Sequence, residues 1–392
     1  MGKPSIGVAV IGAGMAGRAH AAGYRTASTL YETDLPEIRL VAVADKHEPF
    51  AVDAAKRYGY ERAETDWRAV LDAPDVDAVS IVVANSLHRE IAEAALAAGK
   101  HVLCEKPMAP SVPDAQAMVR AAEGTGLVAA LGFTFRRNPA INAIRDRIEN
   151  GELGPVRHFE GHYWCDYGFD PNAPMSWRYK GGPGSGMLAD TGSHVIDVGE
   201  FLCGPVESVR GTVFSTVNKT RPVPLGTAVG HAGGVALSDE RQTVENEDIA
   251  TFNLTFAGGA TGTIQVSRVT FGSANALGFR VFSQNGSAAF ELDRPAQFDI
   301  ADQTAPADSI GYRQVLAGPS HPYLKGGMAM DFPSVGYGQN EGFVFQARAF
   351  LEQIAGFDRL PPCPSFSHGL HNLEVLDAVV EAYNANGKAV IV

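Results

Sequence analysis

The chain has 392 residues, a net charge of −12 and 45% hydrophobic residues. This length exceeds what a single hydrophobic core normally serves, so two domains are expected. The acidic balance argues against a nucleic-acid partner, because phosphate binding needs clustered basic side chains. No stretch approaches the roughly 18 apolar residues that would predict a membrane-spanning helix.

The cysteines and the N-terminus indicate the compartment. The four cysteines show neither a CxxC pair nor any other metal-ligand spacing, so no metal site is predicted from them. The first predicted strand begins at residue 6, which leaves no room for a signal peptide. A reduced, cytoplasmic protein is therefore expected.

A glycine-rich turn follows the first predicted strand, at residues 6–11. It reads Gly12-Ala13-Gly14-Met15-Ala16-Gly17 and leads into an alanine-rich helix. In this strand–turn–helix context the first glycine makes the turn, the second lets a pyrophosphate approach, and the third packs helix on strand. The free N–H groups at the helix start favour an anion. The motif predicts a dinucleotide site.

An acidic residue ends the second predicted strand, residues 38–44. Asp45 is placed to bond the adenine ribose 2′-OH and to repel a 2′-phosphate, which favours NAD over NADP. Its neighbour Lys46 is compatible with a 2′-phosphate, so NADP stays open. The distance from Gly12 to Asp45 also indicates an insertion around residues 31–36.

A series of hydrophobic strands and helices continues to about residue 135. Strands are predicted at 77–83, 101–104 and 127–133, with helices at 89–98 and 112–123. Strands that are apolar throughout and separated by helices predict a parallel sheet covered on both faces. Residues 1–135 are therefore expected to form a Rossmann domain.

The tripeptide Glu105-Lys106-Pro107 directly follows one of these strands. A lysine is costly to bury without a partner or a task, and the proline holds the bend rigid. Ligands bind at the carboxyl ends of strands in such sheets. Lys106 is therefore a candidate functional residue.

The second part of the chain, residues 136–392, has a different pattern. Alternating strands are predicted at 156–164, 206–216, 249–256, 260–269, 277–284 and 287–292, with helices at 346–354 and about 368–384. Gly258-Gly259 and Asn285-Gly286 are hairpin signals. We expect an α+β domain with a large, mostly antiparallel, open-faced sheet, and residues 220–241 as a loop or insertion. The uncovered face predicts a homodimer or homotetramer.

Asp190 and His194 stand one turn apart on a helix predicted over residues 190–202. A carboxylate so placed can fix the tautomer of an imidazole and stabilise its charged form, as proton transfer requires. Two alternatives stay open: Asp190 as a helix cap beside a buried His194, or a metal site with Asp197. A nucleophile elbow is excluded, because Pro183 and Met187 stand where glycines are needed.

Together these motifs resemble the Gfo/Idh/MocA family of glucose–fructose oxidoreductases and inositol dehydrogenases. The resemblance covers essentially the whole chain: the glycine turn, Glu105-Lys106-Pro107, Trp177-Arg178 and the Asp190/His194 helix occur in the family's order. It implies a Rossmann domain, an oligomerising α/β domain, and oxidation or reduction of sugars or cyclitols with NAD or NADP.

The resemblance also implies roles for particular residues. Lys106, Asp190 and His194 would be the catalytic set, with a cis bond before Pro107. The motifs and the resemblance together give these candidate cofactor contacts: Gly12, Ala13, Gly14, Met15, Ala16, Asp45, Lys46, Asn85, His88, Glu105, Trp177 and Arg178. The candidate substrate contacts are Arg136, Asp166, His321 and Tyr323.

Residues 318–323 and 335–338 are similar to a branch of sugar dehydrogenases that includes levoglucosan dehydrogenase. Cys165 departs from that branch, which carries a polar glutamine there, and Asn85-Ser86 departs from the family's usual Thr-Pro or Pro-Asn. Two other functions are hosted by the same fold: an NAD-dependent glycosidase and a non-catalytic dinucleotide-binding regulator.

Overall fold

The computed structural model describes the whole chain except residues 1–4, 32–33, 227–234, 305 and 307. The chain forms two compact units. Unit 1 comprises Met1–Pro139 with Ala317–Leu373, and unit 2 comprises Ala140–Leu316 with Glu374–Val392. The α/β class predicted for the first part and the α+β class predicted for the second are both confirmed.

Unit 1 is built on a six-stranded parallel sheet in the order β3-β2-β1-β4-β5-β6, which is the Rossmann order. Its strands are β1 Ser5–Ile11, β2 Glu37–Ala44, β3 Arg62–Glu64, β4 Ala78–Ile81, β5 His101–Cys104 and β6 Ala129–Leu131. The central strand β1 is buried along nearly its whole length. The continuous apolar runs of the sequence thus became interior strands, as a sheet covered on both faces requires.

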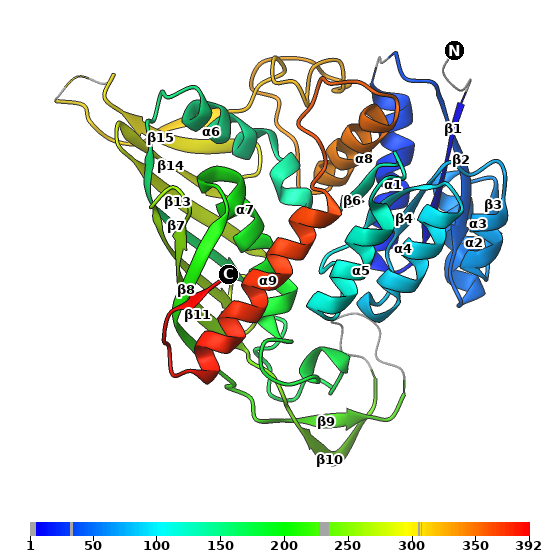
Figure 1. Cartoon of the computed structure of the whole chain (residues 1–392), viewed down its shortest axis with the longest axis horizontal. Helices are drawn as coiled ribbons and strands as arrows, with labels where there is room; N and C mark the ends of the chain where they lie inside the picture. The colour runs from blue at the N-terminus through cyan, green and yellow to red at the C-terminus, as the bar shows by residue number, and fades with distance from the viewer. Residues whose placement is uncertain (1–4, 32–33, 227–234, 305, 307) are drawn as a thin grey trace. The chain divides into compact units, whose positions relative to one another are not determined.

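Helices connect these strands and cover the sheet (Figure 1). They are α1 Met15–Leu30, α2 Glu48–Tyr58, α3 Trp67–Asp72, α4 His88–Ala97 and α5 Val112–Ala122, with the 3₁₀ turns η1 Asn85–Leu87 and η2 Thr134–Arg137. A further helix, α8 Glu341–Ile354, packs on α1. A Cβ on Gly23 of α1 would lie 2.7 Å from the carbonyl oxygen of Phe343, so the two helices approach closely.

The packing of α8 differs from the expected single division at residue 135. Residues Ala317–Leu373 belong to unit 1, although the sequence places them after all the strands of unit 2 except β17. The reason is that apolar side chains of α8, such as Phe350, belong to the same hydrophobic core cluster as Ala21 and Tyr24 of α1. These contacts join distant parts of the chain, so local patterning does not reveal them. The assignment of cofactor and substrate roles to the two parts stays a prediction.

Unit 2 is built on a nine-stranded sheet in the order β16-β15-β14-β13-β7-β12-β11-β8-β17. Its strands are β7 Val156–Trp164, β8 Val206–Ser215, β11 Ile249–Phe256, β12 Thr261–Ser267, β13 Ala276–Ser283, β14 Gly286–Glu291, β15 Gln297–Asp302, β16 Arg313–Leu316 and β17 Val390–Ile391. Among the described strands of this sheet, only β7 and β12 pair in parallel. The hairpins predicted at Gly258-Gly259 and Asn285-Gly286 are confirmed.

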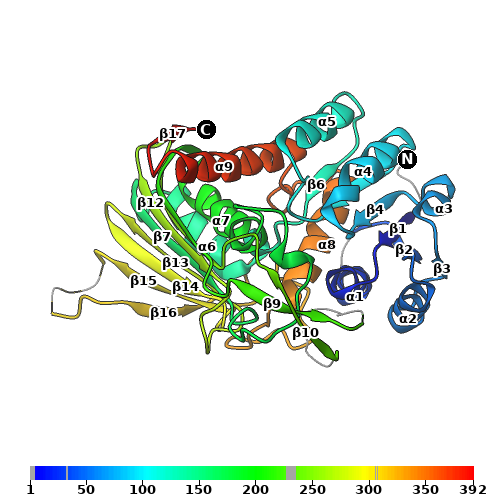
Figure 2. The same cartoon turned by 90° about the horizontal axis from the view of Figure 1, so that it is seen from below.

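One face of this sheet is covered by helices, α6 Pro139–Glu149 and α7 Ser193–Cys203 (Figure 2). On β7, Phe159, Gly161 and Tyr163 are buried, whereas the alternate residues are exposed or half-buried. A Cβ on Gly161 would lie 2.6 Å from a Val195 methyl group, so α7 lies directly on this glycine. The buried set therefore faces α7, and the other set forms the open face.

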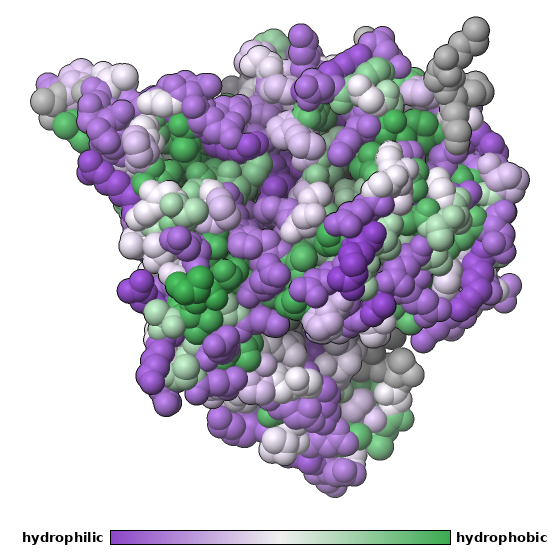
Figure 3. Space-filling view, in the orientation of Figure 1, coloured by the Kyte–Doolittle hydropathy of each residue, from purple (hydrophilic) through white to green (hydrophobic). Residues whose placement is uncertain are grey.

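The helix α9 Phe366–Asn384 confirms the closing helix predicted near 368–384. In the space-filling view a hydrophobic group lies beside the C-terminal end of the chain (Figure 3). Within unit 2, Phe214 of β8 stacks on Tyr383 of α9 with 4.5 Å between ring centroids. Among the described residues, no helix is long and apolar enough to cross a membrane.

Two expectations for unit 2 are corrected. The segment 220–241 is not simply a loop, because β9 Thr220–Pro224 pairs with β10 Leu237–Thr243; residues 227–234 lie outside the described chain. The helix expected from residue 190 begins as a π turn, Leu188–Gly192, and continues as α7. Its predicted core positions Val195, Val198 and Leu202 are buried, as expected.

Candidate active site

The glycine-rich turn between β1 and α1 has the geometry of a pyrophosphate site. Gly12 has φ +105°, and a Cβ there would lie 2.0 Å from the Val82 carbonyl oxygen. A Cβ on Gly17 would lie 1.9 Å from the Gly12 oxygen, whereas nothing lies within 4 Å of a Cβ on Gly14. The outer glycines are thus needed for packing, and the middle one leaves open space at the start of α1. A dinucleotide phosphate can therefore come close to the backbone N–H groups at Gly14.

Asp45 closes this turn from the end of β2. One carboxylate oxygen accepts a hydrogen bond from Ala13 N at 2.8 Å, and the other accepts from His47 N at 2.8 Å. The carboxylate is therefore held beside the glycine turn, where the sequence analysis predicts that the adenine ribose binds. Lys46 is exposed next to it.

The Glu105-Lys106-Pro107 turn follows β5, and the Lys106–Pro107 bond is cis, as the resemblance implied. The Glu105 carboxylate contacts His20 Nε2 at 3.0 Å and accepts from Lys106 N at 3.1 Å. His20 Nδ1 lies 3.2 Å from Ser80 Oγ, which in turn lies 2.9 Å from Tyr24 Oη. This buried chain connects α1, β4 and the turn that carries Lys106.

Burial alone would raise the pKa of Glu105, but the hydrogen bond and charge of His20, aided by Lys106, hold it below its usual value. An ionised Glu105 is therefore retained in the interior. It orients the backbone of Lys106 and leaves the lysine at the carboxyl end of the sheet.

His88 supports the same turn. Its ring nitrogens lie 3.1 Å from the carbonyl oxygens of Pro107 and Val83, and it is 1% exposed. Burial lowers the pKa of His88, against the opposing effect of the carbonyl oxygens that its ring nitrogens face. The structure thus gives His88 a supporting contact behind the turn, while Asn85 is on the 3₁₀ turn η1. Direct cofactor contacts for either residue stay predictions.

In unit 2, Asp190 lies on the π turn and His194 on the first turn of α7. The Tyr167 hydroxyl lies 3.1 Å from an Asp190 carboxylate oxygen, and the Tyr163 ring lies 6.2 Å from the His194 ring. Burial, followed by the charge of Asp190, raises the pKa of Tyr167, so its hydroxyl stays protonated and donates to Asp190. Both tyrosines belong to the end of β7 and the loop after it.

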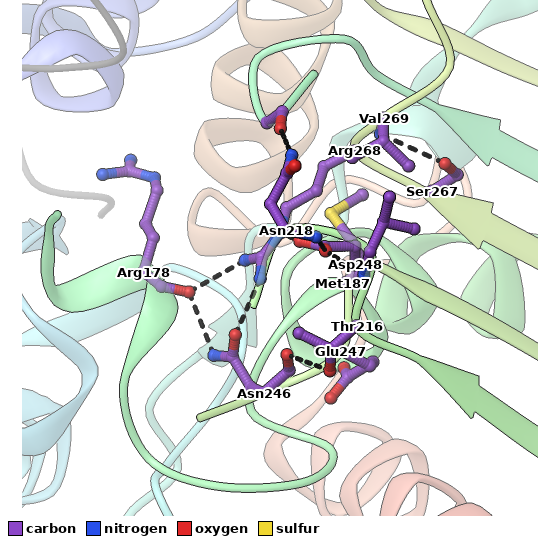
Figure 4. A network of polar contacts seen from close by, with 12 residues as sticks. Arg178, Met187, Thr216, Asn218, Asn246, Glu247, Asp248, Ser267, Arg268 and Val269 are labelled. Carbon is purple, nitrogen blue, oxygen red and sulfur yellow. Dashed lines mark hydrogen bonds and ion pairs between the residues drawn. The ribbon is translucent and has the colours of Figure 1, made fainter. Parts of the chain in front are cut away.

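Trp177 and Arg178 lie on the 3₁₀ turn η3, Trp177–Tyr179, of the same unit. The Trp177 side chain is 74% exposed, and the Arg178 guanidinium stacks on its ring at 4.4 Å. The Arg178 side chain extends away from a buried polar network, whereas its carbonyl oxygen is part of that network (Figure 4). The exposed Trp177 ring is therefore accessible to a ligand.

The four candidate substrate residues have different surroundings. Arg136 is 8% exposed and lies 2.6 Å from His368 Nε2. Tyr323 is 1% exposed, and its hydroxyl accepts from Arg137 at 2.7 Å. This packing gives Tyr323 a structural role, so we leave it out of the proposed substrate site. Asp166 and His321 are half-buried.

Searches with family models agree with these observations. Residues 6–133 match the model described as "Oxidoreductase family, NAD-binding Rossmann fold", and residues 141–289 match the GFO/IDH/MocA C-terminal domain. The chain therefore belongs to the GFO/IDH/MocA family, whose members are NAD-binding oxidoreductases. The resemblance inferred from the motifs is confirmed, and so is NAD as the cofactor.

Particular relatives resemble the chain over its whole length. It is 35% identical to levoglucosan dehydrogenase of Pseudarthrobacter phenanthrenivorans over 383 residues, 96% of each protein. A solved levoglucosan dehydrogenase in complex with NADH and L-sorbose has a TM-score of 0.89 and 32% identity over 99% of each chain. An inositol dehydrogenase homolog from Azotobacter vinelandii has a TM-score of 0.76 over 99% of this chain and 98% of its own, but at 22% identity it shows the fold alone.

Sequence reasoning missed three residues that contact the candidate site residues or their turns. Two are His20 and Tyr167, described above, and the third is Glu247, which accepts a hydrogen bond from Leu188 N of the π turn at 3.0 Å. His20 offered a weak signal, because a polar histidine is unusual among the alanines at the start of a helix that packs on a sheet. Tyr167 and Glu247 offered none. Their partners are 23 and 59 residues away in the chain, so only tertiary folding brings them together.

Proposed function

We propose that this protein reversibly oxidises a secondary alcohol of a sugar, anhydrosugar or cyclitol with NAD. The observation that carries the proposal is the joint presence of the glycine turn, the Lys106 turn and the Asp190/His194 helix in a chain similar throughout to levoglucosan dehydrogenase. A regulator that only bound a dinucleotide would need neither the Lys106 turn nor the Asp190/His194 helix.

His194 is proposed as the general base, with Asp190 as the group that orients it. During oxidation the hydroxyl proton passes to the imidazole as the carbinol carbon loses hydride. Tyr167 stabilises the Asp190 carboxylate through its hydrogen bond of 3.1 Å. A fixed carboxylate in turn stabilises the imidazolium that forms.

Lys106 is proposed to bond the substrate oxygen and stabilise the negative charge that develops on it. The chain from Tyr24 to Glu105 holds the lysine's backbone, so only the side chain remains to be ordered. Lys106, Asp190 and His194 together are the proposed catalytic set. Arg136, Asp166 and His321 remain proposed substrate contacts.

The cofactor residues of unit 1 fit NAD. Gly14 leaves room for the pyrophosphate, and the Asp45 carboxylate is proposed to bond the adenine ribose. Met15 and Ala16 start the helix whose N–H groups face an anion. When bound, the nicotinamide supplies the hydride acceptor or donor. Trp177 and Arg178 are proposed to contact the cofactor as well.

The first test is a screen of NADH and NADPH formation across inositols, aldoses and anhydrosugars. We expect NADH from at least one of these, and a strong preference for NADP would contradict the role given to Asp45. Cleavage of a chromogenic glycoside without net NADH would instead indicate the glycosidase.

Variants of the proposed catalytic set sharpen this test. On the substrate that the screen finds, His194→Ala and Lys106→Ala should each lower kcat by roughly 100-fold or more, since His194 takes the proton and Lys106 stabilises the charge that develops on the substrate oxygen. NADH binding measured by fluorescence should persist. Lys388→Ala, at an exposed position outside the set, is the control. Near-normal turnover in either catalytic variant would remove that residue from the set.

The assembly and location of the protein are also proposals. We propose a homodimer or homotetramer formed through the open face of the nine-stranded sheet. We further propose a cytoplasmic location, which is compatible with the finding that none of the four cysteines forms a disulfide.

A further inference from the structure

The segment between Trp177 and Asp190 is held by an unusual density of buried polar side chains. They come from residues 246–248, which immediately precede β11, and from Arg268 after β12 (Figure 4). Asn246, Glu247, Asp248 and Arg268 are each at most 2% exposed. Burying charged groups is costly, so their placement needs a reason beyond filling space.

Arg268 and Asp248 form the base of this arrangement. Arg268 Nε donates to an Asp248 oxygen at 2.7 Å, and the other Asp248 oxygen accepts from Val217 N and Asn218 N at 2.7 and 3.0 Å. The remaining guanidinium nitrogens donate to Arg178 O at 2.9 Å and to Asn246 Oδ1 at 2.7 Å. The buried pair is therefore fully engaged, and it fixes the Asn246 side chain.

Asn246 holds the first end of the segment. Its amide nitrogen donates to the carbonyl oxygens of Arg178 and Lys180, both at 3.0 Å, and lies 3.2 Å from Ser185 Oγ. The Arg178 carbonyl thus accepts from two buried donors, Asn246 and Arg268. The backbone beneath the exposed Trp177 and half-buried Arg178 side chains is thus fixed at the Arg178 carbonyl.

Glu247 holds the other end. Its two carboxylate oxygens accept from Gly184 N at 2.8 Å and from Leu188 N at 3.0 Å. Leu188 begins the π turn that contains Asp190, so its N–H has no partner within the helix. Glu247 therefore supplies a cap from a distant part of the chain. Burial raises the pKa of its carboxyl group, and the hydrogen bonds from the backbone N–H groups oppose that rise.

We propose that Asn246 and Glu247 are positioning residues for the reaction proposed above. Glu247 sets the place of Asp190, and through it the orientation of His194. Asn246 sets the place of the Trp177-Arg178 turn. Because the two residues are adjacent, one short buried segment fixes both the acid–base helix and the proposed cofactor loop. The proposal rests on the proposed function for its kinetic consequences but not for its structural ones.

The test uses two near-isosteric variants of the full chain. Glu247→Gln puts an NH₂ group against backbone N–H donors, and it should lower kcat for sugar oxidation at least about tenfold, because a misplaced catalytic group reacts slowly. The Kd for NADH should stay within about twofold of the wild-type value. Asn246→Asp puts a carboxylate against two carbonyl oxygens, and it should raise that Kd about fivefold or more.

Glu245→Gln is the matched control. Glu245 makes a similar backbone contact, to Gly181 N at 2.9 Å, but its side chain is 44% exposed. Its variant should change kcat and Kd by less than about twofold, because solvent replaces the lost contact. Equal kinetics in the Glu245→Gln and Glu247→Gln variants would overturn the proposal. So would parallel losses of kcat and NADH affinity in both the Asn246 and Glu247 variants, which would indicate general loosening.

Hydrogen exchange separates this inference from the proposed function. The Gly184 and Leu188 amides should exchange faster in Glu247→Gln than in wild type, whatever the substrate, and unchanged exchange would overturn the proposal. A wild-type protein that binds NADH but oxidises no sugar would overturn the proposed function alone. If Glu247→Gln does not fold, Glu247→Asp keeps the charge, shortens its reach and carries the same expectations.

Discussion

His321 is a half-buried imidazole in unit 1 whose environment keeps it uncharged. Burial lowers the pKa of His321 from 6.5 to about 4, and its Nε2 atom has no hydrogen-bond partner among the described residues. Its ring stacks on Tyr323 with 5.8 Å between centroids. The ring can therefore offer a polar atom to a substrate hydroxyl, but protonation would place a charge in an unfavourable site.

This environment predicts a pH-dependent contribution to stability. Between pH 6.5 and 4 the unfolded chain binds a proton at this residue and the folded chain does not, so stability is present above pH 6.5 and is lost as the pH falls. The loss should reach about 1–2 kcal/mol by pH 5. In His321→Asn this loss is absent.

The measurement is the difference in thermal midpoint between wild type and His321→Asn at several pH values. Whatever the difference at pH 7.5, the thermal midpoint of the wild-type protein should fall relative to that of His321→Asn as the pH approaches 5. Other titrating groups are common to both proteins and cancel. A difference independent of pH would show that His321 titrates normally.

At the scale of elements, two glycines of the turn between β1 and α1 have different roles: one is needed for folding and the other for cofactor binding. Gly12 has a positive φ and no room for a Cβ, whereas Gly14 has room in the protein alone. Gly12→Ala should therefore lower the thermal midpoint by several degrees, because both backbone strain and a clash with the Val82 carbonyl are introduced.

Gly14→Ala is the counterpart. Its thermal midpoint without cofactor should stay close to that of wild type, yet the Kd for NADH should rise about tenfold or more, because the methyl group occupies the space proposed for the pyrophosphate. Calorimetry and fluorescence titration check the two quantities. Unchanged NADH affinity in Gly14→Ala would contradict the placement of the cofactor at this turn.

Other elements show which local patterns were sufficient. The hairpins at Gly258-Gly259 and Asn285-Gly286 followed from turn chemistry alone. The π turn before α7 did not, because it depends on Glu247 holding Leu188 N from the start of another strand. The ribbon of β9 and β10 was also missed, since proline at position 222 and a polar β10 are weak strand signals.

At the scale of the whole molecule, the open face of the nine-stranded sheet predicts self-association. On this face the rings of His162 and Trp164 stack 3.8 Å apart, and Phe282 and Leu316 are 37% and 39% exposed. Light scattering coupled to gel filtration should give two or four times the chain mass of 41.5 kDa. Hydrophobic side chains on a bare sheet face are the physical reason.

Trp164→Glu should shift this protein toward the monomer, because a charge replaces an apolar ring at the interface. Val52→Glu, on α2 of unit 1, is the control and should leave the mass unchanged; Val52 is 48% exposed. A wild-type mass of 41.5 kDa across micromolar concentrations would contradict the proposed assembly.

The sequence by itself determined the classes of both parts of the chain, the glycine turn, the Lys106 turn and the Asp190/His194 pair, because each is carried by local spacing and residue type. Tertiary structure alone decided that Ala317–Leu373 joins unit 1 and that His20, Tyr167 and Glu247 support the proposed catalytic residues. These contacts join residues 23 to 85 positions apart. No local periodicity encodes such pairs; the packing of helices on sheets selects them.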